Sequence, residues 1–281
     1  MVKYLPVNYR CDATVVECTP IIPTVLPGNT SETLEESKYL PRPNVGKFWA
    51  APYHSQAPPG DEFPPTMLEF PFSCGRDIRF VPREGTTDTC LVYTSGFFSP
   101  STVDKPRPAA WAFIYGPAAL TGLSTQQFIP EALRTISGPV EEKGPFGQLA
   151  PPTVVRAHLR AILAALRYRS WQGDGFKTLV IATHSHTVVE GLTWHAEKMT
   201  RDGFQIGPGT LMEDADMWMA TLGEIEYSIS QGLGVKLWCV RNSLNRAAVT
   251  AAERRSASSV GIENYRDYVG VNAIAIQCAY R

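Results

Sequence analysis

The chain has 281 residues, of which 44% are hydrophobic and 19% are charged, a composition typical of a globular protein. Its formal net charge is −1, so it lacks the basic excess with which a non-specific nucleic-acid binder neutralises phosphates. No apolar run approaches the roughly 20 residues that span a bilayer, and the first residues lack the apolar core of a signal peptide. We therefore expect a cytoplasmic protein that binds neither membrane nor nucleic acid, and whose six scattered cysteines are free thiols.

The first part of the chain, residues 1–75, is rich in proline. Of the 23 prolines, 11 lie before residue 66, and consecutive pairs at 58–59 and 64–65 forbid a continuous helix or a central strand. The segment also carries bulky apolar side chains such as Phe48 and Trp49, which a disordered tail would lack. We expect an irregular segment that wraps over the main domain.

The pattern changes after residue 75 to one of strands and helices. Short apolar runs predict strands at 78–81, 90–94, 111–115, 135–139, 178–182 and 235–240. Apolar positions at helical spacing predict helices at 153–166, 187–200, 215–231 and 245–257, with a Gly/Pro loop at 203–209. From residue 90 on, the order β-β-β-α-β-α-α-β-α predicts a mixed sheet with helices on its faces.

Four short strings in this order resemble those of the ribonuclease H fold. They are Thr94-Ser95-Gly96 (Thr-Asp-Gly in the family), Ala157-His158-Leu159 (Ala-Glu-Leu), Thr183-His184-Ser185 (Thr-Asp-Ser) and Asn245 to Val249 (Asn-x-x-Ala-Asp). The surrounding sequence is similar to fungal members. The resemblance implies an α/β, ribonuclease H-like fold with a mixed five-stranded sheet over residues 76–258. Residues 1–75 would wrap this core, and residues 259–281 would extend it.

The resemblance also implies that the family's chemistry is lost. In the family, four carboxylates hold two magnesium ions for in-line attack on a phosphodiester. The corresponding positions here carry Ser95, His158, His184 and Val249, none of which is acidic. We therefore expect no two-metal hydrolysis of nucleic acid.

Histidines at two of these positions suggest a different metal. His158 lies on the apolar face of its predicted helix, and His184 ends a buried strand. His186 is two residues further on, so it would point the same way if the strand continued. Three neutral imidazoles with an open fourth position form a ligand set for catalytic zinc, so we predict a Zn²⁺ site. The alternatives are that each histidine is structural, as we expect of His195 in the core, or that a dead nuclease has decayed.

Further residues are candidates for catalysis and substrate binding. Ser95 would hydrogen-bond a metal-bound water or substrate, or would only fill space. Asp214 or Asp216 would cap the following helix, and either could serve as an acid or base at the rim of the site. Phe97 and Phe98, with aromatic residues of the N-terminal segment, would roof an apolar substrate pocket.

These features lead to three hypotheses of function. The first is a zinc enzyme acting on a small molecule, because the whole chain resembles the zinc-dependent cyclopenases of fungal quinolone alkaloid pathways. That resemblance implies a lyase-type ring contraction of a benzodiazepinedione epoxide (cyclopenin type) to a quinolone (viridicatin type), with zinc as Lewis acid. The second is a catalytically dead binding module for nucleic acid or a protein partner. The third is a nuclease with an unusual metal set. An enclosed aromatic pocket would favour the first, and basic walls the second.

Overall fold

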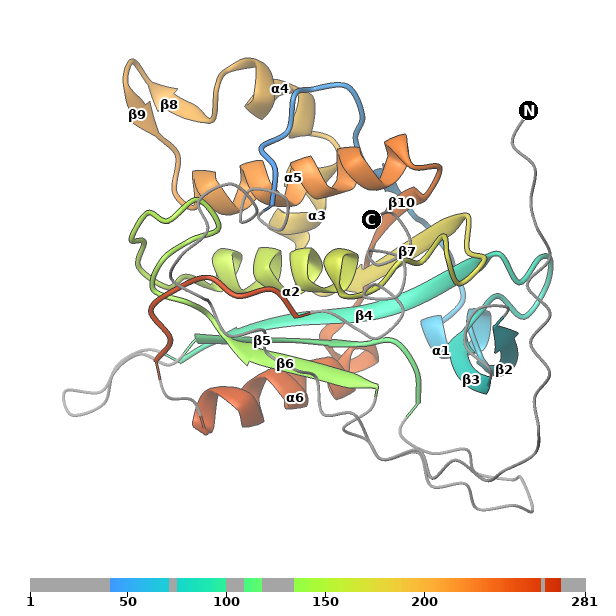
Figure 1. The fold of residues 1–281 in the computed structure, drawn as a ribbon. Coiled ribbons are helices and arrows are strands. Elements are labelled where there is room, and N and C mark those ends of the chain that lie inside the picture. Colours follow the sequence, from blue (N-terminus) through green and yellow to red (C-terminus); the bar gives the residue numbers. More distant parts are fainter. Residues whose placement is uncertain (1–40, 71–74, 100–108, 118–133, 259–260, 269–281) are drawn as a thin grey trace, which may run out of the picture.

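The computed structural model describes residues 41–70, 75–99, 109–117, 134–258 and 261–268. Their core is a mixed sheet with helices on both faces (Figure 1). In Figure 1, α2 and α5 lie above the sheet and α6 lies below it. This is the α/β architecture that the sequence predicts.

Five central strands form the predicted mixed sheet. They are β4 (Thr89–Phe98), β5 (Ala109–Ile114), β6 (Thr135–Pro139), β7 (Thr178–Thr183) and β10 (Gly234–Cys239). Their order is β6-β5-β4-β7-β10; β5 is antiparallel to both its neighbours, and β7 is parallel to both of its own. Strand β7 is buried from its second residue to its last, because the sheet is covered on both faces.

Three short strands from the N-terminal half extend this sheet. Strand β1 (Ala51–Pro52) pairs in parallel with β10, and α1 (Pro59–Glu62) follows it. Strands β2 (Pro65–Phe70) and β3 (Gly75–Phe80) form an antiparallel pair that meets β4 through Phe80. The segment is therefore less irregular than predicted. Its prolines fit because β1 and β2 are edge strands, where a missing N–H costs no ladder bond.

The helices follow the prediction except in one region. They are α2 (Val154–Tyr168), α3 (His186–Leu192), α4 (Ala196–Arg201), α5 (Ala215–Ser230) and α6 (Arg246–Ala257). The single helix expected at 187–200 is broken into α3 and α4, so His195 is exposed at the start of α4 and not in the core. The predicted loop after α4 holds a small hairpin, β8 (Gln205–Gly207) and β9 (Thr210–Leu211). Among the described residues, no helix is long and apolar enough to cross a bilayer.

Helix α2 is the centre of the core. Leu159, Ile162 and Leu163 are fully buried in a cluster that includes Val92 of β4 and Phe113 of β5. Burial of each such side chain contributes about 1.5–3 kcal/mol. The helix begins at an N-cap, where the side chain of Thr153 accepts a hydrogen bond from the Arg156 amide.

Three arginines of α2 make ion pairs away from bulk water. Arg156 lies 2.8 Å from Asp216, Arg160 lies 2.8 Å from Glu141, and Arg167 lies 2.7 Å from Glu224. Residues 261–268 cross this helix as well: the carbonyl of Arg266 accepts a hydrogen bond from Arg160, and Asp267 pairs with Arg167. The C-terminal segment described here is thus tied to α2 by charged groups.

Candidate functional site

The end of β4 is pressed against α2. A Cβ atom on Gly96 would lie 2.3 Å from the backbone nitrogen of His158, so only glycine permits this approach. Its neighbour Ser95 is fully buried, with Oγ 3.4 Å from the Gly96 carbonyl oxygen. A hydroxyl in this position cannot reach a water or substrate without a rearrangement. In this structure Ser95 fills space between β4 and its neighbours, and its predicted hydrogen bond to a water or substrate stays a prediction.

His158 projects from α2 into this junction and is only 2% exposed. Its Nδ1 accepts a hydrogen bond from the Gly96 amide at 3.2 Å and lies 3.1 Å from Oγ1 of Thr183. Burial, and secondarily the neighbouring His184, lower the pKa of His158 to about 3. The imidazole is therefore neutral at physiological pH.

His184 follows the last residue of β7 and contacts His158. The two ring centroids are 4.7 Å apart with the planes at 74°, an edge-to-face contact. The Nδ1 atom of His184 lies 3.2 Å from Nδ2 of Asn245, and the same Nδ2 donates to the Thr94 carbonyl at 2.9 Å. Partial burial lowers the pKa of His184 as well. The structure thus brings together two of the three histidines singled out from the sequence.

The hydrogen bonds fix the protonation pattern of this histidine pair. A backbone amide can only donate, so Nδ1 of His158 carries a lone pair and Nε2 carries the proton. If the oxygen and nitrogen of the Asn245 amide were exchanged, its oxygen would face the Thr94 carbonyl oxygen, which is also an acceptor. The nitrogen Nδ2 is therefore the atom beside His184, and Nδ1 of His184 accepts its hydrogen bond. Both rings are therefore neutral Nε2–H tautomers.

This pattern does not fit a zinc ion. A metal-bound histidine offers the lone pair of one ring nitrogen and donates a proton from the other to a carbonyl, carboxylate or water. Ligation through Nε2 would move the ring proton to Nδ1. In His158 the Nδ1 proton would then face the N–H of Gly96, and in His184 it would face the NH₂ group of Asn245, so two donors would meet in each ring. The residues around the pair therefore oppose metal ligation by either ring.

His186 does not join the pair. The chain turns at Ser185, which caps α3, so His186 begins a helix and does not continue the strand. Its side chain is 73% exposed and lies 3.2 Å from Glu190. Over the residues that the structure describes, no three His, Cys, Asp or Glu side chains are grouped so as to hold a metal ion. The expected cluster of three imidazoles is not assembled.

Asp214 and Asp216 lie in a different cluster at the start of α5. Both are buried, with carboxylate oxygens 3.4 Å and 2.8 Å from Arg156. Asp214 also accepts a hydrogen bond from the Thr153 hydroxyl, and burial raises its pKa. Neither side chain caps α5 by a hydrogen bond. Both carboxylates pair with Arg156 and so join α2 to α5, and their predicted role as acid or base stays a prediction.

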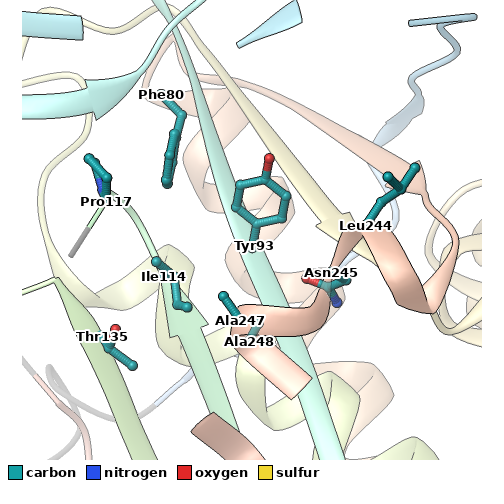
Figure 2. Close-up of a pocket in the computed structure, with 10 residues that line it drawn as sticks. Phe80, Tyr93, Ile114, Pro117, Thr135, Leu244, Asn245, Ala247 and Ala248 are labelled. Atoms are coloured by element: carbon teal, nitrogen blue, oxygen red, sulfur yellow. The ribbon is translucent and has the colours of Figure 1, made fainter. Parts of the chain in front are cut away.

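The pocket nearest the histidine pair lies on the α6 side of the sheet. Its volume is about 270 Å³, and none of its described lining residues is charged. Figure 2 shows Tyr93 of β4 between Phe80 and the 3-10 helix Asn242–Leu244, with Asn245 and Ala247 at the start of α6. The pocket reaches the histidine pair through Asn245, the residue that donates to His184.

The residues predicted to bind substrate do not line this pocket. Phe97 and Phe98 are half-buried at the end of β4, opposite Ala110 and Ala109 of β5. Two residues that do line it, Tyr93 and Phe80, had no assigned role in the sequence, although both stand in predicted strands. A further signal is the position of Asn245 at the start of a predicted helix, in the Asn-x-x-Ala string.

Comparison with known proteins gives no close relative. No protein-family model and no curated protein matches the chain. Solved structures that resemble it include the foamy viral protease-reverse transcriptase in complex with dsDNA, with 14% identity over 60% of this chain and 94% of that chain (TM-score 0.40). The PFV RNase H domain has 16% identity over 59% and 93% (TM-score 0.38), and RNase H1 from Halobacterium salinarum has 16% over 61% and 99% (TM-score 0.35).

Likeness at this level does not establish an activity for this chain. The fold assignment follows from the molecule itself. The predicted element order is observed, except that the helix expected at 187–200 is split into α3 and α4 and the hairpin β8–β9 is added. The five central strands form the expected mixed sheet with helices on both faces. The chain has a ribonuclease H-like fold, and a neutral histidine pair lies where the ends of β4 and β7 meet α2.

Proposed function

We propose that this protein acts on a small, neutral, mostly apolar organic molecule and does not hydrolyse nucleic acid. The observation that carries the proposal is the histidine pair. His158 and His184 are held as neutral Nε2–H tautomers by fixed donors. At the positions where the family binds cations, this chain therefore has two neutral side chains that need no bound cation.

The four aligned positions support the loss of hydrolysis. Magnesium prefers hard oxygen ligands, and carboxylates are its usual protein donors. Ser95 is buried and Val249 is apolar, so neither compensates for the two histidines. A phosphodiester brought to this site would meet no group that could neutralise charge developing on the attacking and leaving oxygens.

The pocket beside the pair supports a small-molecule ligand. An apolar concave site with a few polar groups is typical of small-molecule binding. Its described lining carries no charge, whereas a nucleic-acid site needs Lys or Arg near the phosphates. The net charge of −1 for the whole chain points the same way.

The narrower form of the proposal is a cyclopenase-type ring contraction of a benzodiazepinedione epoxide to a quinolone. The resemblance to fungal cyclopenases motivates it, and in that form zinc would be the Lewis acid. The hydrogen bonds to both Nδ1 atoms oppose a zinc site at this pair, so we derive no step through zinc. The ring contraction and the metal are therefore tested separately.

The test combines two assays on the same preparation. Neutral ring compounds, including a cyclopenin-type epoxide, are incubated with the protein with and without added zinc. Retention after gel filtration and product formation are followed by mass spectrometry. A fluorescent RNA–DNA hybrid is offered in parallel with Mg²⁺ or Mn²⁺. We expect retention of at least one neutral compound and no cleavage of the hybrid.

The controls separate the alternatives. Hybrid cleavage by wild type that is absent from a His184→Ala preparation would overturn the proposal, whereas equal cleavage in both would indicate a contaminant. Retention of the uncut hybrid, with no small molecule bound, would favour the nucleic-acid-binding module instead. Conversion of the epoxide would establish the narrower reaction.

A further inference from the structure

One end of the molecule carries exposed apolar side chains from two segments. These segments are residues 144–154, which lead into α2, and the hairpin β8–β9. They hold five of the eleven large hydrophobic side chains that are exposed among the described residues: Phe146 (37% exposed), Leu149 (72%), Val154 (49%), Ile206 (76%) and Leu211 (56%). We call this group the apolar end. A gathering of this kind on a soluble protein marks a surface that binds something.

Contacts at the start of α5 bring the two segments together. A Cβ atom on Gly144 would overlap the carboxylate of Asp216, so the base of the first segment is packed on the first turn of α5. The Thr153 hydroxyl donates to Asp214, which follows Leu211 by three residues. Figure 1 shows the hairpin above the loop that leads into α2, at the same end of the molecule. The five side chains therefore surround one short region, although they come from distant parts of the sequence.

Neither segment carries a charge. Residues 144–155 and 203–212 contain no acidic or basic residue, in a chain of which 19% is charged. A strongly charged partner would find no group with which to pair in these two segments. A second copy of the chain presents the same neutral segments, so its approach brings no like charges together there. The net charge of −1 also leaves little repulsion between two whole copies.

The hairpin also offers open strand edges beside these side chains. Among the described residues, β8 and β9 pair only with each other, so the outer edge of each strand is open. Edge strands are usually protected by charged side chains or by a covering segment, and neither strand of this hairpin has a charged residue. A two-stranded hairpin is also only marginally stable by itself. Pairing with the hairpin of a second copy would make a four-stranded sheet and cover one open edge on each copy.

We propose that the apolar end is the interface of a symmetric homodimer, with the two β8–β9 hairpins edge to edge and the loops of Phe146 packed beside them. The exposed area agrees with this assignment. At roughly 150–200 Å² for a large side chain, the five fractional exposures leave roughly 500 Å² of apolar surface on each copy. A standard interface buries about 800 Å² on each partner, of which about 60% is apolar. The interface is separate from the uncharged pocket on the α6 side of the sheet.

Sedimentation velocity of the full chain, over low to high micromolar concentrations, tests the proposal. We expect a reversible equilibrium between monomer and dimer. Ile206→Glu would bury a charge in the interface and should weaken the dimer about tenfold or more. Met67→Glu is the matched control, because Met67 is also exposed but lies on β2, far from α5 in Figure 1; it should leave the dimer unchanged. Hydrogen exchange of the amides of residues 205–211 should slow as the protein concentration rises, because the hairpins pair.

A wild-type protein that stays monomeric at every concentration would overturn the proposal. Flotation of that monomer with phosphatidylcholine vesicles would then assign the apolar end to a membrane surface. A dimer that is as strong in Ile206→Glu and Leu211→Glu as in wild type would place the interface elsewhere, and so would equal weakening by Met67→Glu. Circular dichroism checks that the variants fold, which we expect because each replaced side chain is exposed.

Discussion

The neutrality of His158 makes a specific prediction for stability against pH. The folded protein holds this imidazole neutral until the pH falls to about 3, whereas the ordinary value is 6.5. Between these values the unfolded state binds more protons than the folded state. Stability should therefore be complete above pH 6.5 and should fall as the pH is lowered toward 3.

The magnitude follows from the two pKa values. At pH 5 the unfolded imidazole is almost fully protonated and the folded one is not, which costs the folded state about 2 kcal/mol relative to pH 8. No discount for solvent screening is needed, because the side chain is 2% exposed. In His158→Gln this contribution disappears, so the loss of stability from pH 8 to pH 5 should shrink by about 2 kcal/mol.

Urea unfolding at pH 5, 6, 7 and 8 measures this difference, with equal m-values as the condition for comparing variants. His195→Gln, at an exposed histidine, is the matched control and is measured at the same pH values. An unchanged pH dependence in His158→Gln would refute the reasoning. If His158→Gln does not fold, the imidazole ¹⁵N chemical shifts of the wild-type protein report the protonation state of His158 directly. A protonated Nδ1 on His158 above pH 6 would contradict the assigned tautomer.

Three further predictions concern the metal and the packing. Metal analysis of the purified protein should find less than one zinc per chain, and EDTA should leave the thermal unfolding midpoint unchanged. One zinc per chain that is lost in His184→Ala would restore the zinc interpretation. Asp216→Asn should destabilise by about 3 kcal/mol in urea, because it leaves Arg156 buried with a weakened partner, whereas exposed Glu213→Gln should change little. Gly96→Ala should cost about 3 kcal/mol or prevent folding, since the new methyl would meet backbone; a circular dichroism melt at wild-type temperature would contradict the packing described.

Much of the fold could be predicted because its elements have strong local signals. The β7 run is continuously apolar, and α2 repeats apolar residues at helical spacing, so packing and pattern agree. The prediction of one helix at 187–200 is wrong, because the apolar pattern continues across a turn between two helices. An apolar stripe over 187–200 suggested one helix, but the chain turns after Leu192 and restarts at Ala196.

The site is harder to predict, because the direction of a side chain depends on where its strand or helix ends. The proximity of His158 and His184 follows from the strand order, and the sequence strings indicated it. The direction of His186 depended on a strand continuing past Ser185, and a serine N-cap ended it there. Asn245 decides the tautomer of His184 through contacts 61 and 151 residues away, which no local pattern reveals.

Two of the three ion pairs along α2 also specify how α5 can dock. Arg156 meets Asp216 near one end of the two helices, and Arg167 meets Glu224 further along. A slide of α5 by one turn, about 5.4 Å, would separate both pairs at once. Arg167 would keep Asp267, but Arg156, Asp216 and Glu224 would lose these partners in a largely buried setting. Apolar contacts between the same helices would tolerate such a slide more easily, because leucine and isoleucine surfaces are partly interchangeable. The ion pairs thus fix the position of α5 along α2, and they exclude shifted packings that hydrophobic burial alone would allow.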